Sequence, residues 1–208
     1  LRLRVDRRLL SPAESLNALT VGAAHADFLA PNGQGPMAID PYESTALPNP
    51  SSALGLGFKR AIKPEILLPG GAEQIRARST HAPIKVEPVM RPASYFGIGV
   101  ASPGLAGQTN RKLNMSGTSV ATALATHNAI RILEAMEELP DDPAHPRIDP
   151  AFYPVILKAL LVHSAQWDVE AANALRGIIT ENGKLHWEHE RDEISRFLGF
   201  VCPVIDRV

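Results

Sequence analysis

Residues 115–123 read Met115-Ser116-Gly117-Thr118-Ser119-Val120-Ala121-Thr122-Ala123, and the chain changes its periodicity at this point. From Ser119 to Leu139 there is no proline or glycine, and apolar residues recur at helical spacing, which predicts a long helix. The small residues at its start favour close packing against another element. Ser119 is therefore expected in the first turn of a helix that packs on the core.

The segments on either side of this helix predict a chain of strands followed by helices. Apolar runs that predict strands lie at residues 16–24, 62–68 and 95–101. Two further helices are predicted over residues 155–165 and 169–179. Residues 31–57 and 71–94 are broken by proline and polar residues and read as loops, and residues 181–193 read as a charged, mobile segment. This order favours an α/β architecture with a mainly parallel sheet flanked by helices.

Composition narrows the class of protein. The chain has 208 residues, of which 45% are hydrophobic and 21% charged, so it has enough apolar material to bury a core without disulfides. A formal net charge of -1 argues against a nucleic-acid-binding surface, and the single cysteine, Cys202, excludes an internal disulfide framework. No apolar run approaches the roughly 18 residues that a membrane span needs. The basic start of the chain lacks the apolar segment of a signal peptide, and a cytoplasmic location is expected.

The chemistry of residues 115–123 points to Ser119 as a nucleophile. At the start of a helix, free backbone N–H groups and the positive end of the helix dipole can stabilise an oxyanion, as acyl transfer requires. Gly117 and Thr118 precede the serine and would shape the approach of a substrate carbonyl. The alternative is that Ser116 or Ser119 only caps the helix, which serine commonly does.

Five pieces of sequence, in one order, carry a resemblance to a known family. The pattern Gly117-Thr118-Ser119-Val120-Ala121 resembles the Gly-Thr-Ser-x-Ala nucleophile segment of the subtilases, the subtilisin-like serine endopeptidases. The other four pieces, in chain order, resemble the family's strand after the oxyanion-hole asparagine, its Ser-Ser-x-Gly loop, its Lys-Pro-Asp strand and its Val-Lys helix. They lie at residues 17–23, 47–57, 63–70 and 157–165.

The resemblance implies a three-layer subtilisin-like fold, and the chain also departs from the family pattern. Ala123 and Leu124 stand where the family usually has proline and histidine. Pro69-Gly70 lies far ahead of Gly117, so either residues 71–94 are a loop insertion or Pro103-Gly104 is the true counterpart.

A serine nucleophile needs a base and a carboxylate, which the family places before the serine in the order Asp, His, Ser. The candidates within this chain are Asp6, Asp27, Asp40, His25 and His81, and the pair His25 and Asp27 is the alternative to consider. None of them lies in the family's characteristic surroundings. We therefore expect residues 1–208 to be the C-terminal portion of one catalytic domain, incomplete at its N-terminus, whose Asp, His and oxyanion asparagine precede Leu1 and which is inactive alone.

Other functions stay open at this point. A non-catalytic relative would bind an extended peptide beside Ser119 without cleaving it. An α/β-hydrolase esterase would pair Ser119 with Asp168 and with His186 or His189. His186 and His189 are also spaced to share a helix face, but no further metal ligand has a recognised spacing. No cofactor is evident, and the family resemblance implies at most a structural calcium ion; the oligomeric state is left open.

Overall fold

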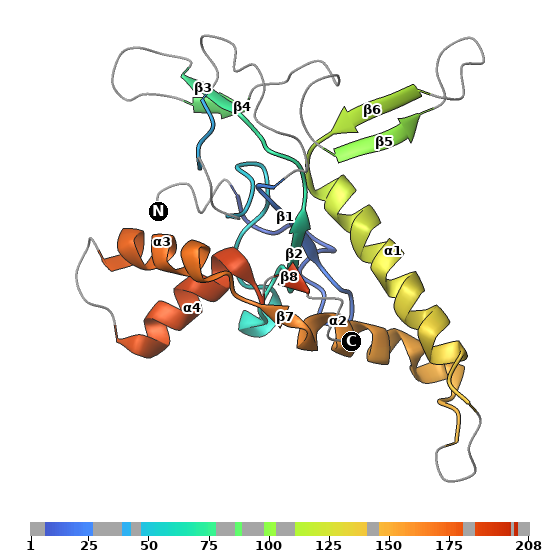
Figure 1. Cartoon of the computed structure of the whole chain (residues 1–208). Helices are drawn as coiled ribbons and strands as arrows, with labels where there is room; N and C mark the ends of the chain where they lie inside the picture. The colour runs from blue at the N-terminus through green and yellow to red at the C-terminus, as the bar shows by residue number, and fades with distance from the viewer. Residues whose placement is uncertain are drawn as a thin grey trace.

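The structure is a computed structural model of the chain, and it describes residues 7–26, 39–42, 47–77, 86–88, 98–102, 111–140, 146–180, 186–200 and 202–203. Two short parallel strands form its centre (Figure 1). Strand β1 spans Val21–Ala24 and strand β2 spans Ile66–Pro69, and Val21 lies opposite Ile66. Both strands are rich in apolar residues, as expected for strands that are covered on both faces.

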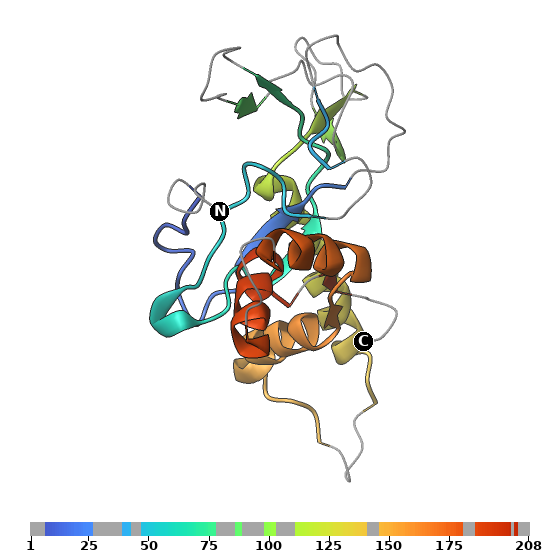
Figure 2. The ribbon, with the colours of Figure 1, turned by 90° about the vertical axis from the view of Figure 1, so that its left-hand side faces the viewer.

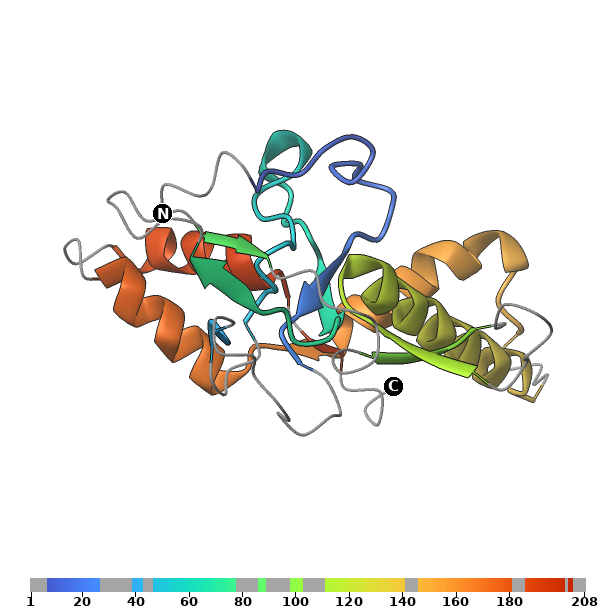
Figure 3. The same ribbon diagram turned by 90° about the horizontal axis from the view of Figure 1, so that it is seen from above.

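Alternate side chains of β1 and β2 face opposite helices, because the side-chain period of a strand is two. On one face Ala23, Ile66 and Leu68 pack with Ala121 and Ala125 of helix α1 (Thr118–Glu137). On the other face Ala24 and Leu67 join a larger apolar cluster with helices α3 (Val169–Thr180) and α4 (Trp187–Leu198). Seen from above, α1 lies on one side of the two strands and α3 and α4 lie on the other (Figure 3).

The remaining elements extend this centre. They are the antiparallel pairs β3 (Ile75–Ala77) with β4 (Val86–Pro88), β5 (Ile98–Ser102) with β6 (Arg111–Met115) and β7 (Ala165–Gln166) with β8 (Cys202–Pro203), the short 3-10 helices η2 (Phe58–Arg60) and η4 (Pro150–Phe152), and helix α2 (Tyr153–His163). Beside one isolated parallel bridge between Arg8 and Leu54, parallel pairing between strands is confined, within the described residues, to β1 and β2. The mainly parallel sheet expected from the sequence is present there only as this pair.

Helix α4 corrects the interpretation of residues 181–193 as a charged, mobile segment. From Trp187 onwards these residues are helical, and α4 packs beside α3 over the strands (Figure 2). Ile194 and Leu198 are buried, and Arg176 of α3 pairs with Glu190 of α4 at 2.8 Å. The helical spacing of Ile194 and Leu198 was the signal to follow, whereas the charged residues before them, from Glu188 to Glu193, obscured it. Residues 181–185 lie outside the described residues.

Buried charges join helix α2 to strand β2. The carboxylate of Glu65 is paired with the ammonium groups of Lys63, which is 1% exposed, and of Lys158, at 2.8 Å. Its second oxygen accepts a hydrogen bond from the backbone N–H of Thr20 at 2.7 Å. Both lysines also donate to the carbonyl of Ala18. Because burial of charge is tolerated only with partners, this network fixes α2 and the start of β1 relative to β2.

Candidate active site

The residue before helix α1, Gly117, has a backbone conformation that only glycine adopts easily. Gly117 is the N-cap residue, with φ 117° and ψ 178°, a combination that residues with a side chain rarely adopt. A Cβ atom built there would meet nothing within 4 Å. The sequence predicts that Gly117 provides room beside the serine. The structure shows a further reason why a glycine is needed at this position, namely its backbone conformation. Gly117 allows the chain to turn sharply from β6 into α1.

The start of α1 is bonded to the end of β2. The backbone N–H of Gly117 donates to the carbonyl oxygen of Gly70 over 2.7 Å, and Gly70 directly follows the strand. Gly70 cannot carry a side chain, because a Cβ atom would lie 2.4 Å from the Cβ of Ala23 on β1. Pro69-Gly70, one of the two pieces considered as the family's Pro-Gly, therefore lies beside the serine segment. Pro103-Gly104 lies outside the described residues, and the insertion at 71–94 stays a prediction.

Ser119 lies in the first turn of α1 and its side chain is exposed. The alternative interpretation of a capping serine is wrong, because the N-cap is Gly117 and no side chain makes a capping hydrogen bond. The first intrahelical bond runs from the N–H of Val120 to the carbonyl of Gly117. The amides of Thr118 and Ser119 precede it, and such first-turn amides are free to bind an anion. A hydroxyl group and oxyanion donors thus coincide at one helix end.

The strand that leads into this turn was underestimated. The sequence Arg111-Lys112-Leu113-Asn114-Met115 reads as a poor strand, which argues against the strand–turn–helix elbow of an α/β-hydrolase, but these residues form β6, which ends two residues before Gly117. Strand β6 pairs with β5 in an antiparallel hairpin, with Ile98 opposite Met115. A short strand with few apolar residues carries little of the signal on which strand prediction depends.

His25 is not a general base for Ser119 in this structure. Its side chain is 6% exposed, its Nε2 lies 2.9 Å from Asp40 Oδ1, and its Nδ1 lies 3.0 Å from Asn49 Oδ1. Both ring nitrogens are therefore already engaged. The carboxylate partner that the structure shows is Asp40, and the alternative pairing with Asp27 is not tested, because Asp27 lies outside the described residues. Asp6, Asp27 and His81 lie outside the described residues.

The residues proposed for the competing functions have other environments. Asp168 accepts a hydrogen bond from the N–H of Ala171 at 2.8 Å and so caps α3. His186 and His189 are exposed at the start of α4. Within the described ranges, no group of three or more His, Cys, Asp or Glu side chains is arranged to hold a metal ion. No helix in the described part is both long and apolar enough to cross a membrane.

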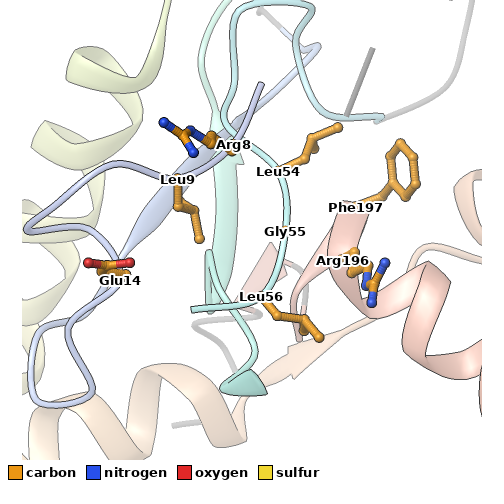
Figure 4. Close-up of a pocket in the computed structure, with 8 residues that line it drawn as sticks. All are labelled: Arg8, Leu9, Glu14, Leu54, Gly55, Leu56, Arg196 and Phe197. Carbon is orange, nitrogen blue, oxygen red and sulfur yellow. The ribbon is translucent and has the colours of Figure 1, made fainter. Parts of the chain in front are cut away.

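The cavity in Figure 4 lies away from the serine. It measures about 430 Å³ and lies between the N-terminal segment, residues 54–56 and the end of α4. Arg8, Glu14 and Arg196 contribute charged groups to its wall, and Leu9, Leu54 and Phe197 contribute apolar ones. None of Gly117, Thr118 and Ser119 lines it. A further cavity lies at the opposite end of α1, beside Met136 and Tyr153.

Sequence reasoning missed the polar cluster around His25. Tyr42 lies edge-on to the imidazole at 5.1 Å, and Arg7 donates to the carbonyls of Ser52 and Asn49. Burial raises the pKa of Tyr42, although the Arg7 charge opposes this shift. Burial also lowers the pKa of Arg7. No motif marks these residues, because they come from separate segments.

An exposed serine at a helix N-terminus, beside the carboxyl ends of parallel strands, is typical of α/β enzymes that use a serine nucleophile. Comparison with protein families is consistent with this class: residues 6–196 match the model of the Subtilase family, Peptidase S8. The match covers more than half of the chain, and the chain belongs to the subtilase family of subtilisin-like serine proteases. Neither the curated proteins nor the solved structures gave a match.

Proposed function

We propose that Ser119 is the nucleophile of a serine endopeptidase and that the triad Asp and His, with the oxyanion asparagine, are supplied from upstream of residues 1–208. The observation that carries the proposal is the exposed Ser119 in the first turn of α1, which is anchored to the end of β2 through Gly117 and Gly70. In a subtilase, this is the position of the Gly-Thr-Ser motif. None of the described histidines is hydrogen-bonded to Ser119.

The proposed reaction is peptide-bond hydrolysis in two steps. The Ser119 hydroxyl oxygen attacks the scissile carbonyl carbon while the base takes the hydroxyl proton, and the first-turn amide of Ser119 donates to the developing oxyanion. The C–N bond then breaks as the base returns its proton to the leaving amine. Water attacks the resulting acyl-serine ester through the same base and releases the acid. Thr118 and Gly117 border the approach of the carbonyl.

The subtilisin-like form of the fold belongs to the same proposal. The helices that cover both faces of β1 and β2 support a three-layer domain with a mainly parallel sheet, and the domain is proposed to be incomplete at its N-terminus. On this proposal residues 1–208 are its C-terminal portion and are inactive alone. Substrates bind extended, by main-chain hydrogen bonds to a sheet edge. A structural calcium ion and a cytoplasmic location remain expectations from the sequence.

A fluorophosphonate probe tests the nucleophile in the full-length protein. We expect one labelled serine, located by mass spectrometry in the peptide that contains Ser119, and loss of labelling in Ser119→Ala. Ser116→Ala is the matched control, because Ser116 is also exposed and lies three residues away, and it should label like the unmodified protein. Labelling that survives Ser119→Ala overturns the proposal. An unlabelled protein that still binds extended peptides would instead be a non-catalytic member of the family.

The same probe separates the esterase alternative. An α/β-hydrolase would lose labelling in Asp168→Asn and in His186→Gln or His189→Gln, because these residues would form its triad. In the proposed endopeptidase, His186→Gln and His189→Gln leave labelling unchanged. Asp168→Asn lowers the stability of α3 by less than about 1 kcal/mol, because asparagine caps a helix about as well as aspartate and only the negative charge at the helix N-terminus is lost.

A further inference from the structure

Three segments meet where β1 and β2 end. His25 directly follows β1, Gly70 directly follows β2, and α1 begins beside them through the bond from Gly117 to Gly70. Because the strands are parallel, their carboxyl ends lie at the same edge. Groups that fix this edge therefore also fix the helix end that carries Ser119.

Asn49 connects His25 to this edge. Its side chain is fully buried, and its Nδ2 donates to the carbonyl of Gly71 at 2.9 Å and, over 3.4 Å, to that of Gly70. The amide nitrogen faces these two carbonyls, so the amide oxygen faces His25 Nδ1 at 3.0 Å. Asn49 is itself held to β1, because its backbone N–H donates to the carbonyl of Ala23 at 2.8 Å.

The other side of His25 is held by a carboxylate. Asp40 Oδ1 lies 2.9 Å from Nε2 and also accepts the backbone N–H of Tyr42 at 3.0 Å. The imidazole ring thus lies between the Asp40 carboxylate and the Asn49 amide oxygen, within hydrogen-bond distance of both. The backbone N–H of Glu73 donates to Nδ1 over 3.2 Å, so the ring is also held by the segment that follows Gly71.

The geometry points to Asp40, His25 and Asn49 as a positioning unit for Ser119, an inference that rests on the proposed function. The hydrogen bonds run without a break from Asp40 through His25 and Asn49 to the Gly70 carbonyl, which also accepts the N–H of Gly117. The unit orients this carbonyl, and through it the first turn of α1. None of the three residues touches the substrate in this role.

The polar character of the unit argues for orientation over plain stability. An apolar set of side chains would fill the same space at lower cost, because buried polar groups are unfavourable unless every partner is present. A satisfied hydrogen-bond chain, however, specifies one arrangement of its donors and acceptors. An acyl-transfer site needs such precision, since a misplacement of about 1 Å costs on the order of a hundredfold in rate.

The test uses Asn49→Asp in the full-length protein, because this change keeps the shape of the side chain and removes the donor to Gly70 and Gly71. Two quantities are measured: the rate constant of the covalent step in fluorophosphonate labelling, separated from probe affinity, and the hydrogen exchange rate of the Gly117 amide. We expect the labelling rate constant to fall about tenfold with little change in affinity. The Gly117 amide should exchange about tenfold faster, while the Leu175 amide in α3 is unchanged.

His127→Gln is the matched control, since His127 is an exposed histidine on α1, and both quantities should stay at their original values. If Asn49→Asp does not fold, Asp40→Asn replaces it as the test, because that change removes only the charge from a partly exposed side chain. We expect Asp40→Asn to change both quantities in the same direction but by less. Asp40→Glu, which keeps the charge, should lie closer to the unmodified protein. Unchanged Gly117 exchange in the folded variant overturns the positioning unit. Absence of labelling in the unmodified protein refutes the proposed function alone, because the exchange measurement does not depend on it.

Discussion

The backbone N–H of Gly117 donates to the carbonyl of Gly70 over 2.7 Å, so the helix that carries Ser119 starts directly on the end of a core strand. Gly70 has no room for a side chain, since a Cβ atom would lie 2.4 Å from the Cβ of Ala23. We expect Gly70→Ala to lower the free energy of unfolding by about 1–3 kcal/mol, measured by urea denaturation.

Gly177→Ala is the control for this change. A Cβ atom at Gly177, within α3, meets nothing within 4 Å, so the alanine should raise stability by up to about 1 kcal/mol through its higher helix propensity. Equal stability of Gly70→Ala and the unmodified protein would contradict the tight approach of β1 to Gly70.

Gly117→Ala tests the backbone conformation at the helix start. Its φ of 117° is strained for alanine although the space is open, so we expect a loss of about 1–3 kcal/mol in the free energy of unfolding and slower labelling of Ser119. Gly55→Ala is matched to it, with a φ of 134° and open space, but Gly55 lies in another loop. That variant should lose similar stability and keep the labelling rate, and a parallel loss of labelling would refute a local role for Gly117.

Because Glu65 is buried between two lysines, we expect replacement of its carboxylate by an amide to lower the free energy of unfolding strongly. Glu65→Gln leaves the ammonium groups of Lys63 and Lys158 without their counter-charge, and breaking a buried pair costs about 3–5 kcal/mol. Urea denaturation should show this loss. The control is Asp192→Asn, which breaks the exposed pair with Arg60 and should cost about 0–1 kcal/mol. Similar losses in the two variants would show that the network is not isolated from water.

Because Tyr42 is buried, we expect the free energy of unfolding to fall at alkaline pH. Burial raises the pKa of its phenol above the ordinary value of about 10, so the folded protein favours the neutral form. This contribution is fully present below the ordinary value and is lost as pH rises through the raised pKa of the folded state. Ultraviolet absorbance of phenolate should show a late-titrating tyrosine that Tyr42→Phe removes and Tyr153→Phe retains. A Tyr42 phenol that ionises at its ordinary pH would contradict the burial.

Some elements could be predicted because their signals are local. Helix α1 was expected over residues 119–139 and spans Thr118–Glu137, and α3 was expected over 169–179 and spans Val169–Thr180. The first strand was expected over 16–24 but is confined to Val21–Ala24, because the preceding residues are occupied by hydrogen bonds to Glu65, Lys63 and Lys158. Those contacts come from distant segments, and no local pattern contains them.

The candidate site likewise contains parts that the sequence predicted and parts that it did not. The motif around Ser119 identified the helix start and the family, since Gly-Thr-Ser-x-Ala is a contiguous string with a local structural consequence. The pair His25 and Asp27 was only an alternative, suggested by their closeness in sequence; Asp27 lies outside the described residues, and the structure pairs His25 with Asp40. Asn49 was not singled out at all, because an isolated asparagine in a loop gives no signal until its neighbours are known.

By itself, the sequence determined the long helix with Ser119 in its first turn, the helix at 169–179 and membership of the subtilase family, because periodicity and contiguous motifs depend only on neighbours along the chain. Tertiary structure alone decided that Gly70 meets Gly117 and that Asp40, His25 and Asn49 form one hydrogen-bonded chain. The reason is physical: hydrogen bonds act over about 3 Å, and only packing of the core brings distant segments within that range.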